Sequence, residues 1–195
     1  MKKISLDDFV KLSLNDVSGK TIAFITDTVW GIGVRVDENI TDGLNKIYKL
    51  KKRDLNKPLA VLTSSKEDAL KHVEITYSKT SDLIKLWPGA LTLIFKKSDD
   101  FYDKVTPLDT IGIRVPNSKV ALGVLKFLGY VATTSINISG MDELNNIVEI
   151  ENSFKDYIDY LIIDTHELSK VSSTVLDISK DSIKVIRLGD LKINV

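Results

Sequence analysis

Residues 21–36 read TIAFITDTVWGIGVRV, and this stretch indicates the fold class of the chain. It contains two short apolar runs, 21–25 and 29–36, rich in the β-branched and aromatic residues typical of strands. The polar triplet 26–28 lies between them. Small and hydroxyl-bearing residues at the end of a strand are common where an α/β protein exposes backbone N–H groups and short side chains to a ligand. The stretch therefore predicts two strands with candidate binding residues at their junction.

Outward from this stretch, segments with helical and strand spacing alternate along most of the chain. Because parallel neighbours need crossover connections, this alternation predicts an α/β layered fold with a mixed sheet. We expect one domain over residues 1–195, since the length suits one well-filled core and no repeat or linker interrupts it. The spacing predicts helices over 5–14, 41–52, 66–73, 81–87, 119–128 and 153–160, and further strands over 59–62, 91–95, 111–115, 131–135, 161–164, 174–179 and 183–188, the last two forming a hairpin.

The composition excludes several classes of protein. The chain has 27 Lys plus Arg and 27 Asp plus Glu, so it has no general attraction to nucleic acid or to an anionic membrane, and any cationic site must be local. It has no cysteine, which excludes disulfides, thiolate nucleophiles and cysteine-ligated metal centres. Asp7 and Asp8 interrupt the start before any signal peptide, and no later run is long enough to span a membrane. We therefore expect a cytoplasmic protein with no membrane partner.

Four cations are the first candidates for chemistry. Lys51 and Arg53, two residues apart at a predicted helix end, could both face one phosphate chain, Lys as a point charge and Arg as a bidentate fork. The alternative, which spacing alone favours, is that they complement the negative C-terminal end of their helix. Arg114 and Arg187 each lie between apolar residues of a predicted strand. A buried cation needs an anion, so each predicts either a structural Asp or Glu or an anionic ligand.

Other polar residues are weaker signals. Ser135 and Asn137 fit a turn or a helix cap as well as a ligand contact, and 172–174 could be the polar start of a strand. Gly31 and Gly33 form neither a Walker A sequence nor a complete dinucleotide fingerprint, and a turn that needs positive φ explains them equally well.

The two histidines do not indicate hydrolytic chemistry. His72 and His166 have no neighbours at metal-ligand spacing, and we expect both on the surface. A site without cysteine or an obvious histidine base suits nucleotidyl transfer, which depends on positioning and charge neutralisation rather than covalent catalysis.

Several segments, in order, resemble the signature blocks of the threonylcarbamoyl-AMP synthase family, also called YrdC-like or TsaC-like proteins. ITDTVWGIG at 25–33 is similar to the family's PTDTVYGLG, and 47–62 is similar to its segment with a Lys-x-Arg signature. The resemblance covers about residue 20 to the end. Ile25, Asp54 and Leu188 stand where the family usually has proline. These three differences remove no side chain of a type that binds a ligand. Four further blocks match at 87–95 (WPGALTLIF), 110–116 (TIGIRVP), 133–140 (TTSINISG) and 172–177 (SSTVLD).

The resemblance implies an α/β fold, a single YrdC-like domain with a twisted mixed sheet, flanking helices and a concave cationic surface. It implies the formation of threonylcarbamoyl-AMP and pyrophosphate from L-threonine, bicarbonate or CO₂, and ATP, for the threonylcarbamoyladenosine modification of tRNA. It also implies Mg²⁺ held mainly by the ATP phosphates, a link to the tRNA threonylcarbamoyl transferase machinery, and weak tRNA binding. Because the chain ends shortly after Arg187, we expect no counterpart of the extra C-terminal domain of longer members.

The resemblance further implies roles for ten residues. Lys51 and Arg53 would be catalytic and would neutralise the ATP phosphates. The carboxylate of threonine would pair with Arg114, while its amine stays neutral to form a carbamate that attacks the α-phosphate. No metal site made of protein side chains is expected. The further ATP contacts would be Thr110, Ser135, Asn137 and Arg187, and threonine would lie among Thr28, Arg114, Thr133 and Ser173.

Two other functions remain open from the sequence. A non-catalytic module that binds double-stranded RNA or tRNA is one, although zero net charge counts against it because such binding rests on many phosphate contacts. A carbamoyl-adenylating module related to hydrogenase maturation is the other. That module normally belongs to a larger chain with zinc-finger parts, which a cysteine-free chain cannot supply.

Overall fold

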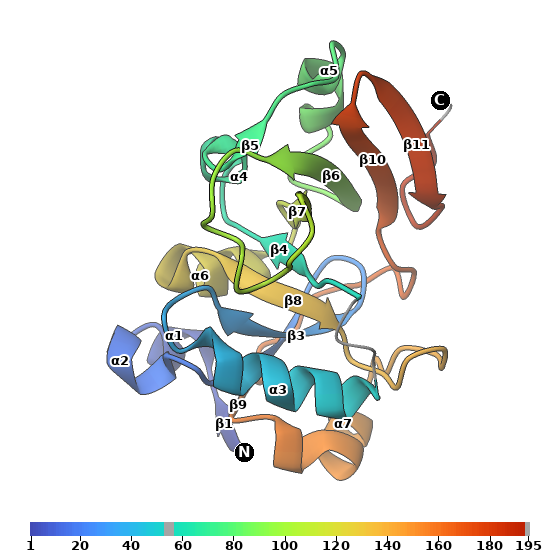
Figure 1. The fold of residues 1–195 in the computed structure, drawn as a ribbon. Coiled ribbons are helices and arrows are strands. Elements are labelled where there is room, and N and C mark those ends of the chain that lie inside the picture. Colours follow the sequence, from blue (N-terminus) through green and yellow to red (C-terminus); the bar gives the residue numbers. More distant parts are fainter. Residues whose placement is uncertain (53–56, 194–195) are drawn as a thin grey trace.

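A twisted, mixed β-sheet is the framework of the protein (Figure 1). The computed structural model describes residues 1–52 and 57–193, and within them eleven strands join one sheet in the order β1-β9-β2-β3-β8-β4-β7-β6-β10-β11, with β5 paired to β6. The strands are β1 (Lys2–Ile4), β2 (Thr21–Ile25), β3 (Trp30–Arg35), β4 (Ala60–Leu62), β5 (Val73–Glu74), β6 (Leu91–Lys97), β7 (Thr110–Arg114), β8 (Val131–Ser135), β9 (Tyr160–Ile162), β10 (Thr174–Lys180) and β11 (Ser182–Arg187).

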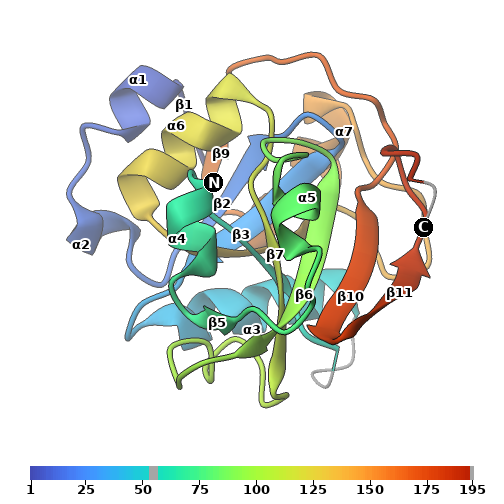
Figure 2. The same ribbon diagram turned by 90° about the horizontal axis from the view of Figure 1, so that it is seen from above.

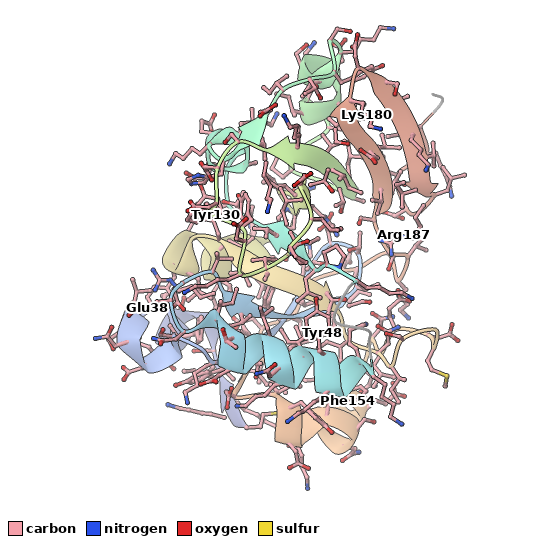
Figure 3. The ribbon with its side chains drawn as sticks, viewed as in Figure 1. Glu38, Tyr48, Tyr130, Phe154, Lys180 and Arg187 are labelled. Carbon is pink, nitrogen blue, oxygen red and sulfur yellow. The ribbon has the colours of Figure 1, made fainter. Side chains whose placement is uncertain are left out.

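Both kinds of strand pairing occur, which confirms the predicted mixed sheet. Strands β1 and β2 pair parallel with β9, β4 pairs parallel with β7, and β6 pairs parallel with β10. The stretch 21–36 forms the antiparallel pair β2–β3, in which Ile25 lies opposite Trp30. The predicted closing hairpin is the antiparallel pair β10–β11, with Lys180 and Arg187 at its opposite ends (Figure 3).

Helices flank the sheet. Figure 1 shows α3 running along β3, with α7 beyond it, and Figure 2 shows α6 and the β10–β11 hairpin on opposite sides of the molecule. No helix in the described part of the chain is both long and apolar enough to cross a bilayer. The helices are α1 (Leu6–Phe9), α2 (Leu14–Val17), α3 (Ile40–Lys51), α4 (Lys66–Leu70), α5 (Thr80–Ile84), α6 (Lys119–Leu128) and α7 (Ile147–Phe154), with a 3₁₀ turn at Lys155–Tyr157.

The predicted boundaries hold best where the apolar pattern is strongest. Helix α6 and strand β8 have the predicted limits. The single helix expected over 5–14 is wrong, because Ser13 accepts from the backbone N–H of Asp16 and caps a second helix. The helical stretch expected near 153–160 begins and ends earlier, as α7 followed by the 3₁₀ turn, since the Asn146 side chain caps α7 well before that segment. The two- and three-residue strands β5 and β1 carry too little pattern to predict.

His72 corrects another expectation. Its side chain is 25% exposed rather than on the open surface, and its ring stacks on Phe101 with 4.0 Å between the ring centroids. Its Nδ1 lies 2.8 Å from Asp99 Oδ2. The histidine therefore helps to pack an aromatic cluster, in which Tyr102 and Tyr130 meet its ring edge to face.

Candidate functional site

A cavity of about 500 Å³ lies against one face of the sheet, where seven neighbouring strands contribute residues. Residues opposite one another on paired strands share a face, and such pairs line the cavity together, for example Leu62 with Arg114 and Ile94 with Gly112. The cavity is therefore a concave part of the sheet itself. Its described lining is Thr26, Thr28, Val29, Gly31, Lys57, Pro58, Leu59, Ala60, Leu62, Thr92, Ile94, Leu108, Thr110, Gly112, Arg114, Thr133, Thr134, Ser135, Ser172, Ser173, Val175, Asp177, Ile186 and Arg187.

The glycines of β3 permit close approach of β8. A Cβ on Gly33 would lie 2.5 Å from Val131 Cγ1 and 2.8 Å from Thr133 Oγ1, and one on Gly31 would lie 3.1 Å from Thr133 Cγ2. Neither glycine has a positive φ, so the explanation by a left-handed turn is wrong. Both lie inside a strand, and their missing side chains leave room for Thr133 at the cavity floor.

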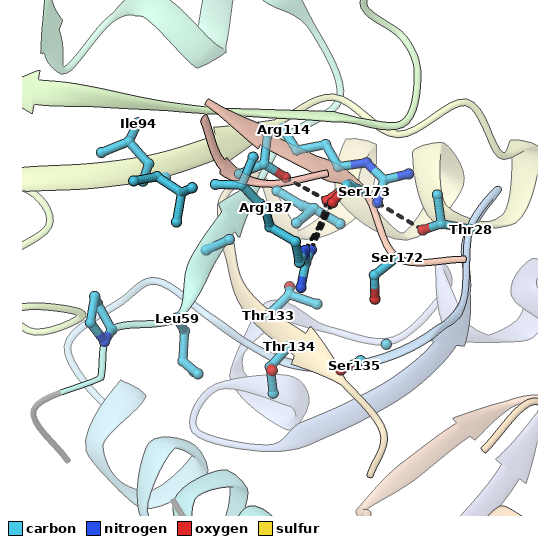
Figure 4. Close-up of a pocket in the computed structure, with 18 of the residues that line it drawn as sticks. Thr28, Leu59, Ile94, Arg114, Thr133, Thr134, Ser135, Ser172, Ser173 and Arg187 are labelled. Atoms are coloured by element: carbon cyan, nitrogen blue, oxygen red, sulfur yellow. Dashed lines mark hydrogen bonds between the residues drawn. The ribbon is translucent and has the colours of Figure 1, made fainter. Parts of the chain in front are cut away.

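Arg114 is held at one end of the cavity by three hydrogen bonds. Its Nη1 donates to Thr28 Oγ1 at 2.8 Å (Figure 4). Its Nε donates to Gly89 O at 2.9 Å, and its Nη2 donates to Asp27 Oδ1 at 2.6 Å. The residue is only 6% exposed. Burial lowers the pKa of the guanidinium, and the Asp27 carboxylate opposes that shift. Asp27 is thus a structural anion for Arg114, which is one of the two alternatives that the sequence left open.

The Arg114 guanidinium nevertheless keeps capacity for a ligand. An arginine has five N–H donors, and three are used within the described residues. Arg114 also lines the cavity. The two remaining donors, one on each Nη, can bind an anion in the cavity, so the structural and the ligand-binding roles are compatible.

Arg187 and Ser173 form a second polar group at the cavity wall. The Arg187 Nε and Nη2 donate to Ser173 O at 3.1 and 2.9 Å, and Nη2 also reaches Ser173 Oγ at 3.3 Å (Figure 4). Ser173 Oγ lies 2.9 Å from Thr92 Oγ1. Residues from β6, β11 and the start of β10 are therefore linked around one hydroxyl group.

Lys51, at the end of α3, is buried against the end of β8. Its Nζ donates to Ser135 O at 2.8 Å and to Asn137 Oδ1, and the residue is 2% exposed. Asn137 Oδ1 also accepts from Ser135 Oγ at 2.8 Å. Ser139 N donates back to Lys51 O at 2.9 Å. The lysine thus ties the helix to the turn after β8 instead of only complementing its own helix end.

The structure brings together most of the predicted site. Seven of the ten predicted residues line the cavity, and Lys51 and Asn137 contact it through Ser135. Arg53 lies outside the described residues. The prediction did not include two carboxylates, Asp27 and Asp177. The seven are Thr28, Thr110, Arg114, Thr133, Ser135, Ser173 and Arg187.

Protein ligands for a metal ion are scarce around the cavity. Within 1–52 and 57–193, no three His, Cys, Asp or Glu side chains gather as a metal site. Asp177 is the only carboxylate in the described lining. Any divalent cation in this cavity would need most of its ligands from a bound molecule.

Comparison with known proteins gives consistent matches. The family Sua5_yciO_yrdC, described as "Telomere recombination", matches residues 17–189. A Methanocaldococcus jannaschii protein is 32% identical over 189 residues, or 95% of this chain and 86% of that protein. The Bacillus subtilis threonylcarbamoyl-AMP synthase is 31% identical over 88% of this chain, and the match spans 50% of the enzyme. The structure of P. abyssi Sua5 complexed with L-threonine has a TM-score of 0.84 at 27% identity, covering 97% of this chain and 58% of that one.

Proposed function

This chain belongs to the Sua5/YciO/YrdC family, and from that membership we propose that it is a threonylcarbamoyl-AMP synthase. It would convert L-threonine, bicarbonate or CO₂, and ATP into threonylcarbamoyl-AMP and pyrophosphate. The observation that carries the proposal is the cavity, where a buried arginine with spare donors lies among hydroxyl side chains from separate strands. The site is large enough for more than an amino acid alone, at about 500 Å³.

The Arg114 end of the cavity is the proposed threonine site. The two spare N–H donors of Arg114 would bind the carboxylate as a bidentate pair. Thr28, Thr133 and Ser173 supply small hydroxyl groups around it. A structure of P. abyssi Sua5 holds L-threonine, which supports a threonine site in this family.

The nucleotide would lie beside threonine, along the sheet. Thr110, Ser135 and Arg187 line this part of the cavity, and Asn137 shapes it through the bond to Ser135. Lys51 would favour anionic phosphates by placing a positive charge behind Ser135. Direct contacts of Lys51 and Arg53 with the phosphates stay predictions.

The reaction needs little covalent chemistry from the protein. The neutral threonine amine would form a carbamate in one of two ways. It would add to CO₂ and release a proton, or it would add to bicarbonate and release water with no net proton. A carbamate oxygen would attack the α-phosphorus of ATP, the bond to the β-phosphate oxygen would break, and pyrophosphate would leave. The cations here would hold the reactants in line and stabilise charge on the leaving group.

Mg²⁺ bound to ATP fits this donor set. One carboxylate among the described lining residues suits a cation held mainly by phosphate oxygens, and Mg²⁺ would supply neutralisation of phosphate charge. We also propose that the product serves the tRNA threonylcarbamoyl transferase machinery, with weak tRNA binding by this chain.

The test is pyrophosphate release from ATP by the purified protein, with threonine and bicarbonate omitted in turn. Dependence on both supports the synthase. Dependence on threonine alone would indicate simple amino-acid adenylation. A salt-dependent RNA gel shift without any nucleotide turnover would instead favour an RNA-binding module.

A further inference from the structure

Asp177 on β10 is a carboxylate in a cavity whose other described residues offer hydroxyl, apolar and cationic groups. Side chains alternate between the faces of a strand, so Ser173, Val175 and Asp177 line the cavity while Leu176 and Ile178 are buried in the core. Four residues at about 3.3 Å each place Asp177 about 13 Å along the chain from Ser173. The carboxylate therefore lies well away from the proposed threonine site.

The cavity lining beside Asp177 is apolar. Ile94 lies opposite Asp177 on the neighbouring strand, and Ile186 also lines the cavity. Gly112 lies opposite Ile94, and a Cβ built on it would meet no atom nearer than Thr92 Cγ2 at 3.4 Å. The absence of a side chain at Gly112 thus leaves this part of the cavity floor open. An apolar floor with one polar acceptor is typical of a site for a flat ring that carries a hydrogen-bond donor.

Figure 4 shows Ile94 and Thr28 on opposite sides of the cavity, so the apolar end and the Arg114 end are separate. Threonine held through its carboxylate at Arg114 would lie on the Thr28 side, across the cavity from Ile94, which is the residue opposite Asp177. A phosphate group beside Asp177 would be repelled by the carboxylate. The part of ATP that suits this end is therefore the nucleoside.

The carboxylate is also fixed in orientation. Its Oδ1 accepts from Ser179 N at 3.0 Å and from Ser179 Oγ at 2.7 Å. No described residue donates to its Oδ2. Lys184 lies opposite on β11, but the two side chains form no ion pair within the described chain. One oxygen is thus anchored, and the other is available as an acceptor.

We propose that Asp177 selects the nucleoside of the nucleotide substrate by accepting a hydrogen bond from one of its donors. This inference rests on the proposed function. The donor is either the exocyclic amine of adenine or a ribose hydroxyl, which share the same chemistry toward a carboxylate. Guanine carries an acceptor oxygen at the position of the adenine amine, so the base contact would reject GTP. A ribose contact would instead reject 2′-deoxy-ATP or 3′-deoxy-ATP.

The test compares the full-length protein with Asp177→Asn, Asp177→Ala and the control Asp181→Asn. The amide introduced by Asp177→Asn can keep the bonds to Ser179 but presents an N–H donor in place of the second acceptor oxygen. Asp181 is exposed on the same hairpin and does not line the cavity. The readout is kcat/KM for pyrophosphate release with ATP, GTP, 2′-deoxy-ATP and 3′-deoxy-ATP. Calorimetric binding of the same nucleotides is a second readout, and melting temperatures identify variants that fail to fold.

We expect Asp177→Asn to reduce the preference for ATP over one class of analogue by about 10- to 100-fold, the usual range for a hydrogen bond to a charged group. If the variant no longer discriminates against GTP, the base is the group that donates to Asp177. If it no longer discriminates against a deoxynucleotide, the ribose is the donor. Asp181→Asn should leave the ratio of kcat/KM between ATP and each analogue unchanged. The inference is overturned if folded Asp177 variants keep all ratios within about twofold, or if only the Mg²⁺ requirement changes. Wild-type protein that binds nucleotides selectively but releases no pyrophosphate would contradict the proposed function alone.

Discussion

The two arginines that follow isoleucine in β7 and β11 occupy opposite environments. Arg114 lies in a strand with neighbours on both sides, is 6% exposed, and pairs with Asp27 at 2.6 Å. Arg187 ends the edge strand β11, is exposed, and donates to Ser173. Similar local sequences thus produce a buried ion pair and a surface cation. The position of the strand in the sheet decides between them, because β7 has a neighbouring strand along each edge while β11 has one along a single edge.

Arg114→Ala should have the largest effect. It leaves the Asp27 carboxylate, 15% exposed, without its cation, and loss of one member of a buried ion pair costs about 3–5 kcal/mol in the free energy of unfolding. Chemical denaturation measures this change in the free energy of unfolding. The double variant Asp27→Asn/Arg114→Ala should recover part of the loss, since the unpaired charge is gone. A double variant less stable than Arg114→Ala would contradict the ion-pair explanation.

Lys51→Ala extends the comparison to a third cation, which is buried and donates to the neutral oxygens of Ser135 and Asn137. We expect pyrophosphate release to slow by about 100- to 1000-fold, as loss of an electrostatic stabiliser typically does. Arg53→Ala is predicted to behave similarly. Lys49→Ala is the matched control, because Lys49 is exposed on the same helix. Near-normal turnover by both Lys51→Ala and Arg53→Ala would show that neither residue has this role.

Replacing threonine by serine as substrate tests the Arg114 end without changing the protein. The two amino acids differ by one methyl group, which a fitted pocket distinguishes by about 1–3 kcal/mol. Pyrophosphate release with serine should therefore be measurable but poor in kcat/KM. Equal use of the two amino acids would mean that no pocket is fitted to the methyl group.

Arg187→Ala should have the smallest effect on folding. The side chain is exposed, and loss of its bonds to Ser173 should cost about 1 kcal/mol or less. The KM for ATP should rise while the melting temperature changes little. A loss of stability as large as that of Arg114→Ala would remove the contrast between the central and the edge strand.

Local pattern was sufficient for much of the fold. The amphipathic spacing of 119–128 and the apolar run of 131–135 gave α6 and β8 their limits, because such elements depend on neighbours a few residues away. The helix predicted over 5–14 failed because one capping side chain, Ser13, was weighed less than the apolar spacing. The strand order was not predictable, since it depends on pairings between distant segments.

In the candidate site, too, local sequence pattern predicted some features and pairings between distant segments decided others. The order of the sequence blocks identified seven residues that line the cavity. Asp27 was visible as part of a polar triplet, but nothing local paired it with Arg114, which is 87 residues away in the chain. Asp177 could have been found, because the alternation of a strand places it on the face of Ser173. Its apolar surroundings depend on β6, β7 and β11.

The sequence by itself determined most strands and most helices, the absence of cysteine chemistry and the residue types available for binding an anion. These follow from composition and from interactions between near neighbours. Only the tertiary structure decided that Arg114 is paired, that Lys51 points to the end of β8, and that Asp177 faces a cavity. Burial and charge pairing depend on which strands become neighbours, and that is a property of the whole sheet.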